Sequence, residues 1–224
     1  MRGKKVQVME GNIAMISKIK LGLHAVQRWG FSFLMGIVTM GICPVSAEVL
    51  LATNFESGTI SDWTVFSTSN GTLGGKGFPI VALCDHGNPG SPSYCLQVQV
   101  GQLHFAPTHE VQQGGGISLT TMTIAGLIQL SARVGVTYHS PDHKRNLNGG
   151  LFEWVVDDQV IADLDIGPME DGGTVQHQFI GKAPVAAGRH AIQLRVTRPF
   201  QSGAGKPSPV QFIDDVMVEL LSQP

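Results

Sequence analysis

The chain has 224 residues, with 15 Lys and Arg, 17 Asp and Glu, and three Cys. Its first 47 residues hold six of the bases and one of the acids, so a chain cleaved after Ala47 keeps nine bases and 16 acids, a net charge of −7 with His neutral. Such an acidic surface disfavours nucleic acids and anionic membranes as partners. The remaining 177 residues are enough for one domain with a substantial core.

The first 47 residues are typical of a secretory signal peptide. Basic residues precede an apolar run at 31–43, and a proline and a Val-Ser-Ala tripeptide follow it. The run is too short to cross a bilayer as a helix. We therefore predict cleavage before Glu48, no membrane anchor after cleavage, and a secreted, extracellular or periplasmic protein. Met15 is an alternative start, and a lipoprotein signal at Cys43 is the rival interpretation, disfavoured by the bulky residue before it.

Cleavage leaves two cysteines, Cys84 and Cys95, in a compartment that allows oxidation. The ten residues between them are dense in turn formers. We predict a disulfide that closes this loop between two strands and stabilises the fold by roughly 2 to 3 kcal/mol. The alternatives are two free thiols or half of a metal site, although the spacing is not that of a metal knuckle.

From residue 48 onward the pattern is that of short strands and turns, with no helical period in any long window. The Gly114-Gly115-Gly116 run and residues 139–150 are predicted to be breaks. Ten to twelve short strands predict an all-β fold, a two-sheet antiparallel jelly-roll sandwich over residues 48–224. The clearest strands are predicted at 48–55, 63–67, 78–83, 94–100, 128–138, 151–156, 160–166, 175–180, 190–196 and 211–220.

The last predicted strand carries two carboxylates in an apolar alternation. If it is extended, one face holds Phe212, Asp214, Val216, Val218 and Leu220. A carboxylate in phase with a buried face needs a metal, a cation or several hydrogen-bond donors. Asp215 is out of phase, and we expect it to contact solvent or a loop.

Several short segments resemble the secreted jelly-roll superfamily of carbohydrate-binding modules, laminin-G-like and MAM-like domains. The segments are Asn54-Phe55-Glu56-Ser57-Gly58 with Trp63, Gly90-Ser91 before Ser93-Tyr94-Cys95-Leu96-Gln97-Val98, Ala187-Gly188-Arg189-His190, and Phe212-Ile213-Asp214-Asp215-Val216. The resemblance implies that the first and last strands are neighbours and that a structural calcium sits at their ends. It implicates Asp214, with Glu56 as a co-ligand, and calcium prefers such oxygen ligands. The alternative is that Asp214 caps loop amides or pairs with an Arg.

Polar side chains alternate with apolar ones on three predicted strands. If these strands share a sheet, the amides and guanidinium groups suit sugar hydroxyls or a uronate carboxylate. The alternative is an ordinary solvated sheet face. Trp63, Tyr94 and Tyr138 fall on apolar faces and are predicted to be core residues. The predicted ligand-binding residues are Gln97, Gln99, Gln129, Arg133, Gln193 and Arg195.

No catalytic residue is predicted. Asp163-Leu164-Asp165 lacks the glutamates of the jelly-roll glycosidases, and Asp157-Asp158 fits a hairpin turn. We expect a secreted protein that binds a polysaccharide without catalysis. The alternatives are a polysaccharide lyase or glycosidase, and a structural or adhesive envelope protein. The enzyme would use His139 or His143 with Arg133 or Arg145.

Overall fold

The structure is a computed structural model, and it describes residues 47–84, 92–104, 112–140, 148–202 and 208–221. The chain divides into two compact units, Met1–Gly41 and Ile42–Pro224, and all described residues belong to the second. Residues 1–46 of the predicted signal peptide, 1–47, lie outside the described residues, and the signal peptide stays a prediction. The described segments contain no helix long and apolar enough to cross a membrane.

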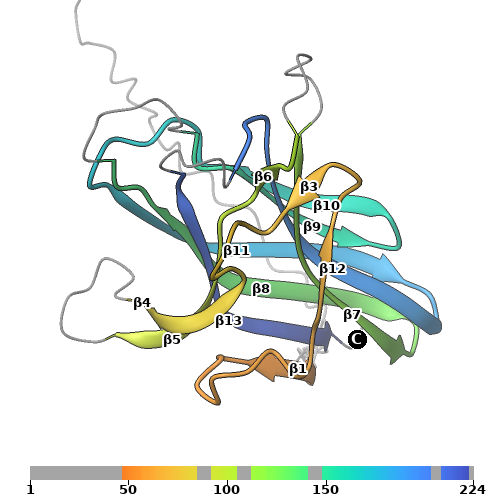
Figure 1. Ribbon diagram of the computed structural model, residues 1–224. Helices are drawn as coiled ribbons and strands as arrows, with labels where there is room; N and C mark the ends of the chain where they lie inside the picture. The colour runs from red at the N-terminus through yellow and green to blue at the C-terminus, as the bar shows by residue number, and fades with distance from the viewer. Residues whose placement is uncertain (1–46, 85–91, 105–111, 141–147, 203–207, 222–224) are drawn as a thin grey trace, which may run out of the picture. The chain divides into compact units, whose positions relative to one another are not determined.

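Sheet A is an antiparallel sheet with the long last strand β13 in the middle (Figure 1). The strand order is β11-β8-β13-β5-β4, and β1 also pairs with β13. One edge of β13 pairs with β5 through Gln211–Ile213 and with β1 through Val216–Leu221, so the first strand does lie beside the last. The strands are β1 (Ala47–Thr53), β4 (Ile80–Cys84), β5 (Ser93–Val98), β8 (Gly126–Thr137), β11 (Thr174–Val185) and β13 (Val210–Leu221).

Sheet B is the second antiparallel sheet, in the order β10-β9-β12-β7-β2. The predicted hairpin at 151–166 forms two of its strands and turns at Asp157 and Asp158, both with positive φ. A short third ladder pairs β3 (Gly71–Thr72) with β6 (Gly101–Gln102). The strands of sheet B are β2 (Thr64–Ser67), β7 (Gln113–Thr123), β9 (Leu151–Val156), β10 (Gln159–Asp165) and β12 (Gly188–Arg198).

The apolar positions of the alternating strands form one core between the two sheets. Trp154 of sheet B stacks on Phe179 of sheet A, with ring centroids 6.0 Å apart and planes at 17°. Its indole Nε1 also donates to the carbonyl of Phe179 at 3.4 Å, so the ring's one polar atom is satisfied. The predicted all-β, two-sheet antiparallel jelly-roll sandwich is therefore confirmed.

The phase predicted for the last strand is wrong, because β13 contains a bulge. Its pairing with β8 shifts between Asp214 and Met217, and Asp215 has φ of 47°. A bulge adds one residue to a strand and reverses the alternation beyond it. Ile213 and Val216 both belong to the core between the sheets, so Asp214 shares the opposite face with Phe212. We call the face of each sheet that points away from this core its outer face.

The Gly114-Gly115-Gly116 run is not a break, as predicted, but part of β7. A Cβ added at Gly114 would lie 2.1 Å from the carbonyl oxygen of Val196, and one at Gly116 would lie 2.0 Å from that of Leu194. Only glycine tolerates so close an approach of two backbones. The run therefore marks tight contact between β7 and β12.

The predicted disulfide is present and joins the edge strand β4 to its neighbour β5. Cys84 and Cys95 have Cα atoms 6.0 Å apart, within the usual range for this bond. Both cysteines pack with Phe212 in a small apolar cluster on the outer face of sheet A, apart from the main core. The bond thus fixes the edge of sheet A rather than the sandwich interior.

Candidate functional site

The six predicted ligand-binding residues do not lie in one sheet, so the expectation that their three strands share a sheet is wrong. Gln97 lies on β5, and Gln129 and Arg133 lie on β8, all in sheet A. Gln193 and Arg195 lie on β12 in sheet B. Three alternating strands look alike in sequence, but the long-range pairing assigns them to different layers.

On sheet A these polar side chains bind other parts of the protein. The amide of Gln97 donates to the carbonyl of Leu83 at 3.3 Å, and that of Gln129 donates to Glu219 at 2.8 Å. Arg133 forms an ion pair with Asp215 at the bulge. Gln99, which follows β5, donates to the carbonyl of Ser208 at 3.4 Å. The outer face of sheet A thus uses its polar groups to hold neighbouring strands and loops.

The outer face of sheet B carries a row of residues that runs across all five strands. In this row Arg195 of β12 pairs with Gly116 of β7 on one side and with Glu153 of β9 on the other. Asp163 of β10 is opposite Glu153, and Phe66 of β2 is opposite Gly116. We call this row, with Gln193 beside it, the polar face of sheet B.

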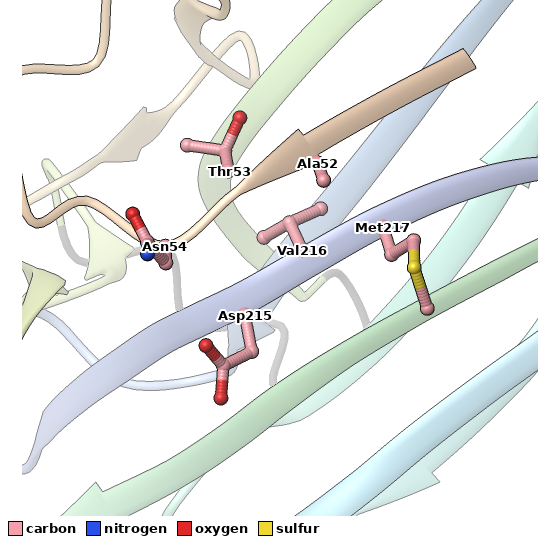
Figure 2. A pocket seen from close by; sticks show the side chains of 6 residues that line it. All are labelled: Ala52, Thr53, Asn54, Asp215, Val216 and Met217. Atoms are coloured by element: carbon pink, nitrogen blue, oxygen red, sulfur yellow. The ribbon is translucent and has the colours of Figure 1, made fainter. Parts of the chain in front are cut away.

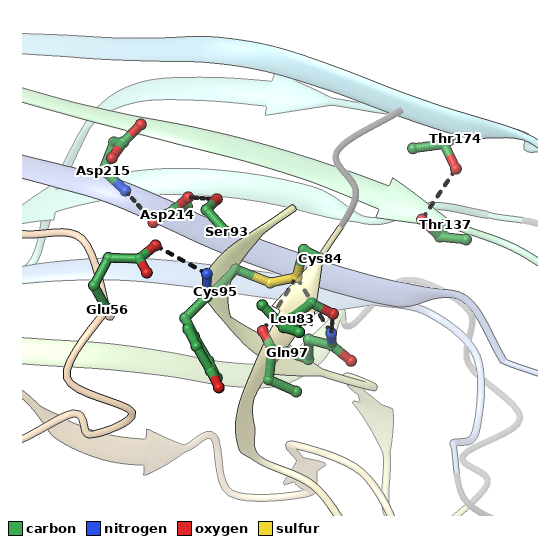
Figure 3. The surroundings of a disulfide bond; sticks show 12 residues. Glu56, Leu83, Cys84, Ser93, Cys95, Gln97, Thr137, Thr174, Asp214 and Asp215 are labelled. Carbon is green, nitrogen blue, oxygen red and sulfur yellow. Dashed lines mark hydrogen bonds between the residues drawn. A yellow bond between two sulfur atoms is a disulfide. The ribbon is translucent and has the colours of Figure 1, made fainter. Parts of the chain in front are cut away.

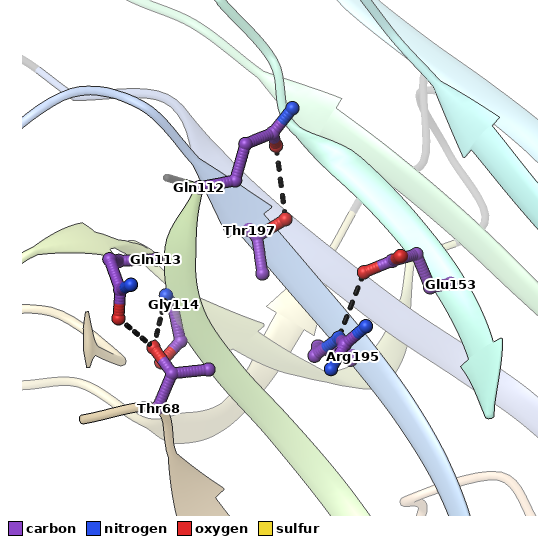
Figure 4. Close-up of polar contacts among 7 residues, drawn as sticks. All are labelled: Thr68, Gln112, Gln113, Gly114, Glu153, Arg195 and Thr197. Carbon is purple, nitrogen blue, oxygen red and sulfur yellow. Dashed lines mark hydrogen bonds and ion pairs between the residues drawn. The ribbon is translucent and has the colours of Figure 1, made fainter. Parts of the chain in front are cut away.

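An ion pair lies in the middle of the polar face of sheet B. Arg195 Nε donates to Glu153 Oε2 at 2.8 Å, and the two side chains point toward each other in Figure 4. The Arg195 side chain is 29% exposed and that of Glu153 is 12% exposed. The pair therefore sits low on the surface, and the guanidinium keeps other N–H groups beyond the one bound to Glu153.

A strip without side chains separates this ion pair from an aromatic ring. Gly114 and Gly116 point outward from β7, because a side chain on Gly115 would meet the core residue Leu73. Strands lie about 4.8 Å apart, which places the backbone of Phe66 roughly 10 Å from that of Arg195 across the glycines. The half-buried Phe66 is not part of the core cluster. The strip therefore has an apolar ring on one side and charged groups on the other.

Two polar groups of this face are open to a ligand. In the part of the chain that the structure describes, the Gln193 amide and the Asp163 carboxylate have no hydrogen-bond or ion-pair partner. Thr197, further along β12, instead donates to Gln112 at 3.0 Å (Figure 4). The open amide, the open carboxylate and the partly used guanidinium are groups that hydrogen-bond vicinal hydroxyls.

Three residues of this face are missed by sequence reasoning. The pattern places Phe66 only in a short strand, Glu153 in a hairpin, and Gly116 in a break. A signal for Glu153 is present, since it lies between Phe152 and Trp154, both fully buried. Nothing in the sequence places Phe66 beside the glycine run, because residues 50 positions apart form this contact.

The predicted calcium ligands lie near the start of β5. Asp214 is 1% exposed and accepts hydrogen bonds from Ser93 Oγ at 3.0 Å and from the Asp215 amide at 2.8 Å. Glu56 accepts one from the amide of Tyr94, the next residue, at 3.0 Å. Figure 3 shows Asp214, Ser93 and Glu56 in this region. The contacts of Asp214 also match the capping alternative.

Calcium binding at Asp214 and Glu56 stays a prediction. Among the described residues, no three His, Cys, Asp or Glu side chains gather as a metal-binding group. Two carboxylates that reach consecutive residues fit calcium only if backbone carbonyls supply further ligands. Asp215, expected in solvent or at a loop, is exposed, and it also pairs with Arg133.

A pocket of about 280 Å³ lies between the end of β1 and the bulge of β13 (Figure 2). Its polar side chains already have partners: Thr53 accepts from the Trp63 indole at 3.3 Å, and Asn54 from the Glu56 amide at 3.3 Å. Asp215 is held by Arg133. The lining residues are Ala52, Thr53, Asn54, Asp215, Val216 and Met217. The pocket thus belongs to the framework around the bulge.

Only some of the residues predicted for an enzyme lie in the described segments. His143 and Arg145 lie outside the described residues. His139 is exposed, with Nδ1 3.7 Å from Asp171. Of the aromatic residues predicted to be core, Trp63 and Tyr138 are buried, but Tyr94 is 37% exposed because it lies near the start of β5.

A histidine outside the candidate site has a perturbed pKa. His190 Nδ1 lies 2.6 Å from Asp157 Oδ2, and its Nε2 lies 2.9 Å from the carbonyl of Ala186. The hydrogen bond to Asp157 raises the pKa of His190, and the same bond lowers the pKa of Asp157. This contact ties the β9–β10 turn to the β11–β12 turn.

Arg198, at the end of β12, is a fully buried cation. Burial lowers its pKa to about 10. It donates from Nε to the carbonyl of Asn148 at 2.6 Å and from Nη1 to that of Val100 at 3.1 Å. These bonds join three segments that are distant in sequence, so Arg198 serves the fold.

The fold is an antiparallel β-sandwich with polar side chains on both outer faces, and on sheet B some of these groups are open to a ligand. The chain matches no protein-family model and no curated protein. Among solved structures it resembles TmCBM61 in complex with β-1,4-galactotriose, at 16% identity and a TM-score of 0.42 over 74% of this chain and 93% of that one.

Two further solved structures show similar likeness. The CBM22-1 xylan-binding domain from Paenibacillus barcinonensis Xyn10C is 12% identical, with a TM-score of 0.41 over 81% of this chain and all of that one. The carbohydrate-binding module CBM6cm-2 from Cellvibrio mixtus lichenase 5A, in complex with cellotriose, is 11% identical, with a TM-score of 0.33 over 79% of this chain and all of that one. All three likenesses have TM-scores below 0.5, so we infer function from the chain's own residues.

Proposed function

We propose that this protein is a secreted, non-catalytic carbohydrate-binding protein whose ligand lies on the polar face of sheet B. The observation that carries the proposal is the row in which Phe66 lies on one side of the glycine strip and the Arg195–Glu153 pair on the other. A sugar ring presents an apolar face that stacks on aromatic rings and hydroxyls that bind planar polar groups. The residues on the two sides of the strip offer these two kinds of contact close together.

The outer face of sheet A offers less to a ligand. Its glutamines and its arginine bind a backbone carbonyl, Glu219 and Asp215. A ligand there would have to replace bonds that the protein already makes, and leaving those partners unpaired costs free energy. Gln193 on sheet B requires no such exchange.

The proposal is tested by binding the purified protein to a panel of polysaccharides, with reducing and unsaturated ends assayed in the same samples. We expect retention by at least one polysaccharide and no new chain ends. Gln193→Ala should weaken binding about fivefold, the value of one hydrogen bond. Gln129→Ala on sheet A is the matched control and should bind like the wild type. New ends would indicate an enzyme, and no binding to any glycan would favour a structural envelope protein.

We further propose that a calcium ion stabilises the fold where β1 and β5 meet β13, with Asp214 and Glu56 as carboxylate ligands. The support is that both side chains contact consecutive residues, Ser93 and Tyr94, and so bring hard oxygen donors to one place. Chelation should lower the melting temperature of the wild type, and Asp214→Ala should remove that response. A melting temperature that chelation leaves unchanged would exclude the metal.

A further inference from the structure

The charges on the polar face of sheet B bear on which glycans it can accept. The one guanidinium of the row, Arg195, is bound to Glu153, so its positive charge is already compensated. Arg189 is exposed on the same face of β12, six residues away and outside the row. Asp163, directly across β9 from Glu153, is exposed and has no ion-pair partner in the described part of the chain. Asp165, two residues further on the same edge strand, is also exposed. The row therefore carries an excess of negative charge.

We propose that this face selects uncharged polysaccharides and rejects polyuronates, an inference that rests on the function proposed above. A uronate carboxylate placed at Arg195 would have to displace Glu153, which is only 12% exposed and would be left as a poorly hydrated charge. A carboxylate placed nearer β10 would meet Asp163 and Asp165 and be repelled. Hydroxyl groups face neither obstacle, because they can accept from Arg195 and donate to Glu153 or Asp163 at once.

Of the two ligand types that fit the sequence, sugar hydroxyls and a uronate carboxylate, the charges of this face favour the hydroxyls. An arginine among glutamines suits either sugar hydroxyls or a uronate carboxylate, and the partner of that arginine decides between them. Glu153 thus acts as a specificity-determining residue, because it holds the guanidinium through Nε and compensates its charge. Replacing the carboxylate by an amide removes the charge and keeps an oxygen that can accept from Arg195 Nε.

The test compares two polysaccharide pairs with the same backbone that differ chiefly in charge: polygalacturonate with its methyl ester, and carboxymethyl cellulose with hydroxyethyl cellulose. Binding is measured by affinity electrophoresis and calorimetry at low salt, where charge effects are largest. We expect the wild type to bind the neutral member of a recognised pair at least about tenfold more tightly. Glu153→Gln should reduce or reverse this ratio, and Asp163→Asn should reduce it by a smaller factor.

Glu219→Gln is the matched control. It removes the same charge from the molecule, but from the outer face of sheet A, where Glu219 accepts from Gln129. The ratio should stay at the wild-type value in this variant. Equal binding of the charged and neutral members by the wild type would overturn the selectivity and leave carbohydrate binding intact. A similar change in Glu219→Gln and Glu153→Gln would assign the effect to net charge and overturn the role of this face.

Discussion

Arg133 pairs with Asp215 on the outer face of sheet A, and Arg195 pairs with Glu153 on the outer face of sheet B. The first pair closes a bulge and is surrounded by polar groups that bind the protein itself. The second stands beside a strip of glycines and an open glutamine amide. Similar residues on similar strands thus serve the framework in one sheet and form a candidate binding surface in the other.

Removal of the disulfide should have the largest effect on stability. It also distinguishes the two sheets, because it changes the edge of sheet A and leaves the proposed binding face of sheet B intact. Replacing Cys84 and Cys95 by Ser should lower the free energy of unfolding by roughly 2 to 3 kcal/mol, because the unfolded chain regains the freedom of the closed loop. Glycan binding should not change, since the bond lies at the edge of sheet A. Denaturant unfolding and binding of the same sample check both. Lost binding in a folded double variant would count against a site confined to sheet B.

The Arg195–Glu153 pair should contribute more to stability than its counterpart on sheet A. Arg195→Ala leaves the largely buried Glu153 without its cation, and we expect a loss of about 1 to 2 kcal/mol. Glu153→Gln keeps a hydrogen-bond acceptor without the charge and should lose less. Urea unfolding of the three proteins measures the difference. Equal stability of all three would mean that the pair is as well hydrated as an exposed one.

The contact between His190 and Asp157 should make one end of sheet B sensitive to pH. Because the folded-state pKa of His190 is raised, its contribution is complete below about pH 6.5 and is lost as the pH rises through the raised value. Because the pKa of Asp157 is lowered, the contribution is also lost at acid pH, as the pH falls through that lowered value. Between these limits His190→Gln should cost on the order of 1 kcal/mol.

This pH dependence is measured as the difference in unfolding free energy between the wild type and His190→Gln from pH 4 to pH 9. The difference should be largest near pH 5 to 6 and should shrink toward pH 9. A difference that grows with pH would mean that neutral His190 is the stabilising form.

The smallest effect is expected for the ion pair on sheet A. The side chains of Arg133 and Asp215 are 33% and 43% exposed, and exposed pairs contribute between 0 and about 1 kcal/mol. Arg133→Ala should therefore lower the unfolding free energy by less than about 1 kcal/mol. A larger loss would show that the pair is needed to form the bulge, and Asp215→Asn would then be expected to lose a similar amount.

Local alternation is enough to predict most strands and the fold class. Strands such as β8 and β12 place an apolar side chain at every second residue, and this pattern depends on nothing distant. The same rule fails in β13, because Asp215 adopts a positive φ and adds a residue to the strand. Asp tolerates that conformation better than most residues, so the Asp-Asp pair within an apolar run is the available signal.

The candidate site is predictable only in part. Gln193 and Arg195 are recognisable as outward polar residues, but Gln97 and Arg133 look the same and belong to the other sheet. Sheet membership depends on pairing between distant strands, which no local pattern records. The glycines of β7 resemble a break, because glycine usually weakens strands and the nearby backbone of β12 is not visible in the sequence.

Glycan affinity of Arg195→Ala and Arg133→Ala, measured side by side with the wild type, tests the central claim most directly. The ligand is whichever polysaccharide of the panel the wild type retains, and Arg195→Lys serves as a variant that keeps the charge but not the planar fork. We predict that Arg195→Ala binds at least about tenfold more weakly, that Arg195→Lys is intermediate, and that Arg133→Ala equals the wild type. Weaker binding by Arg133→Ala with full binding by Arg195→Ala would contradict the account and place the ligand on sheet A.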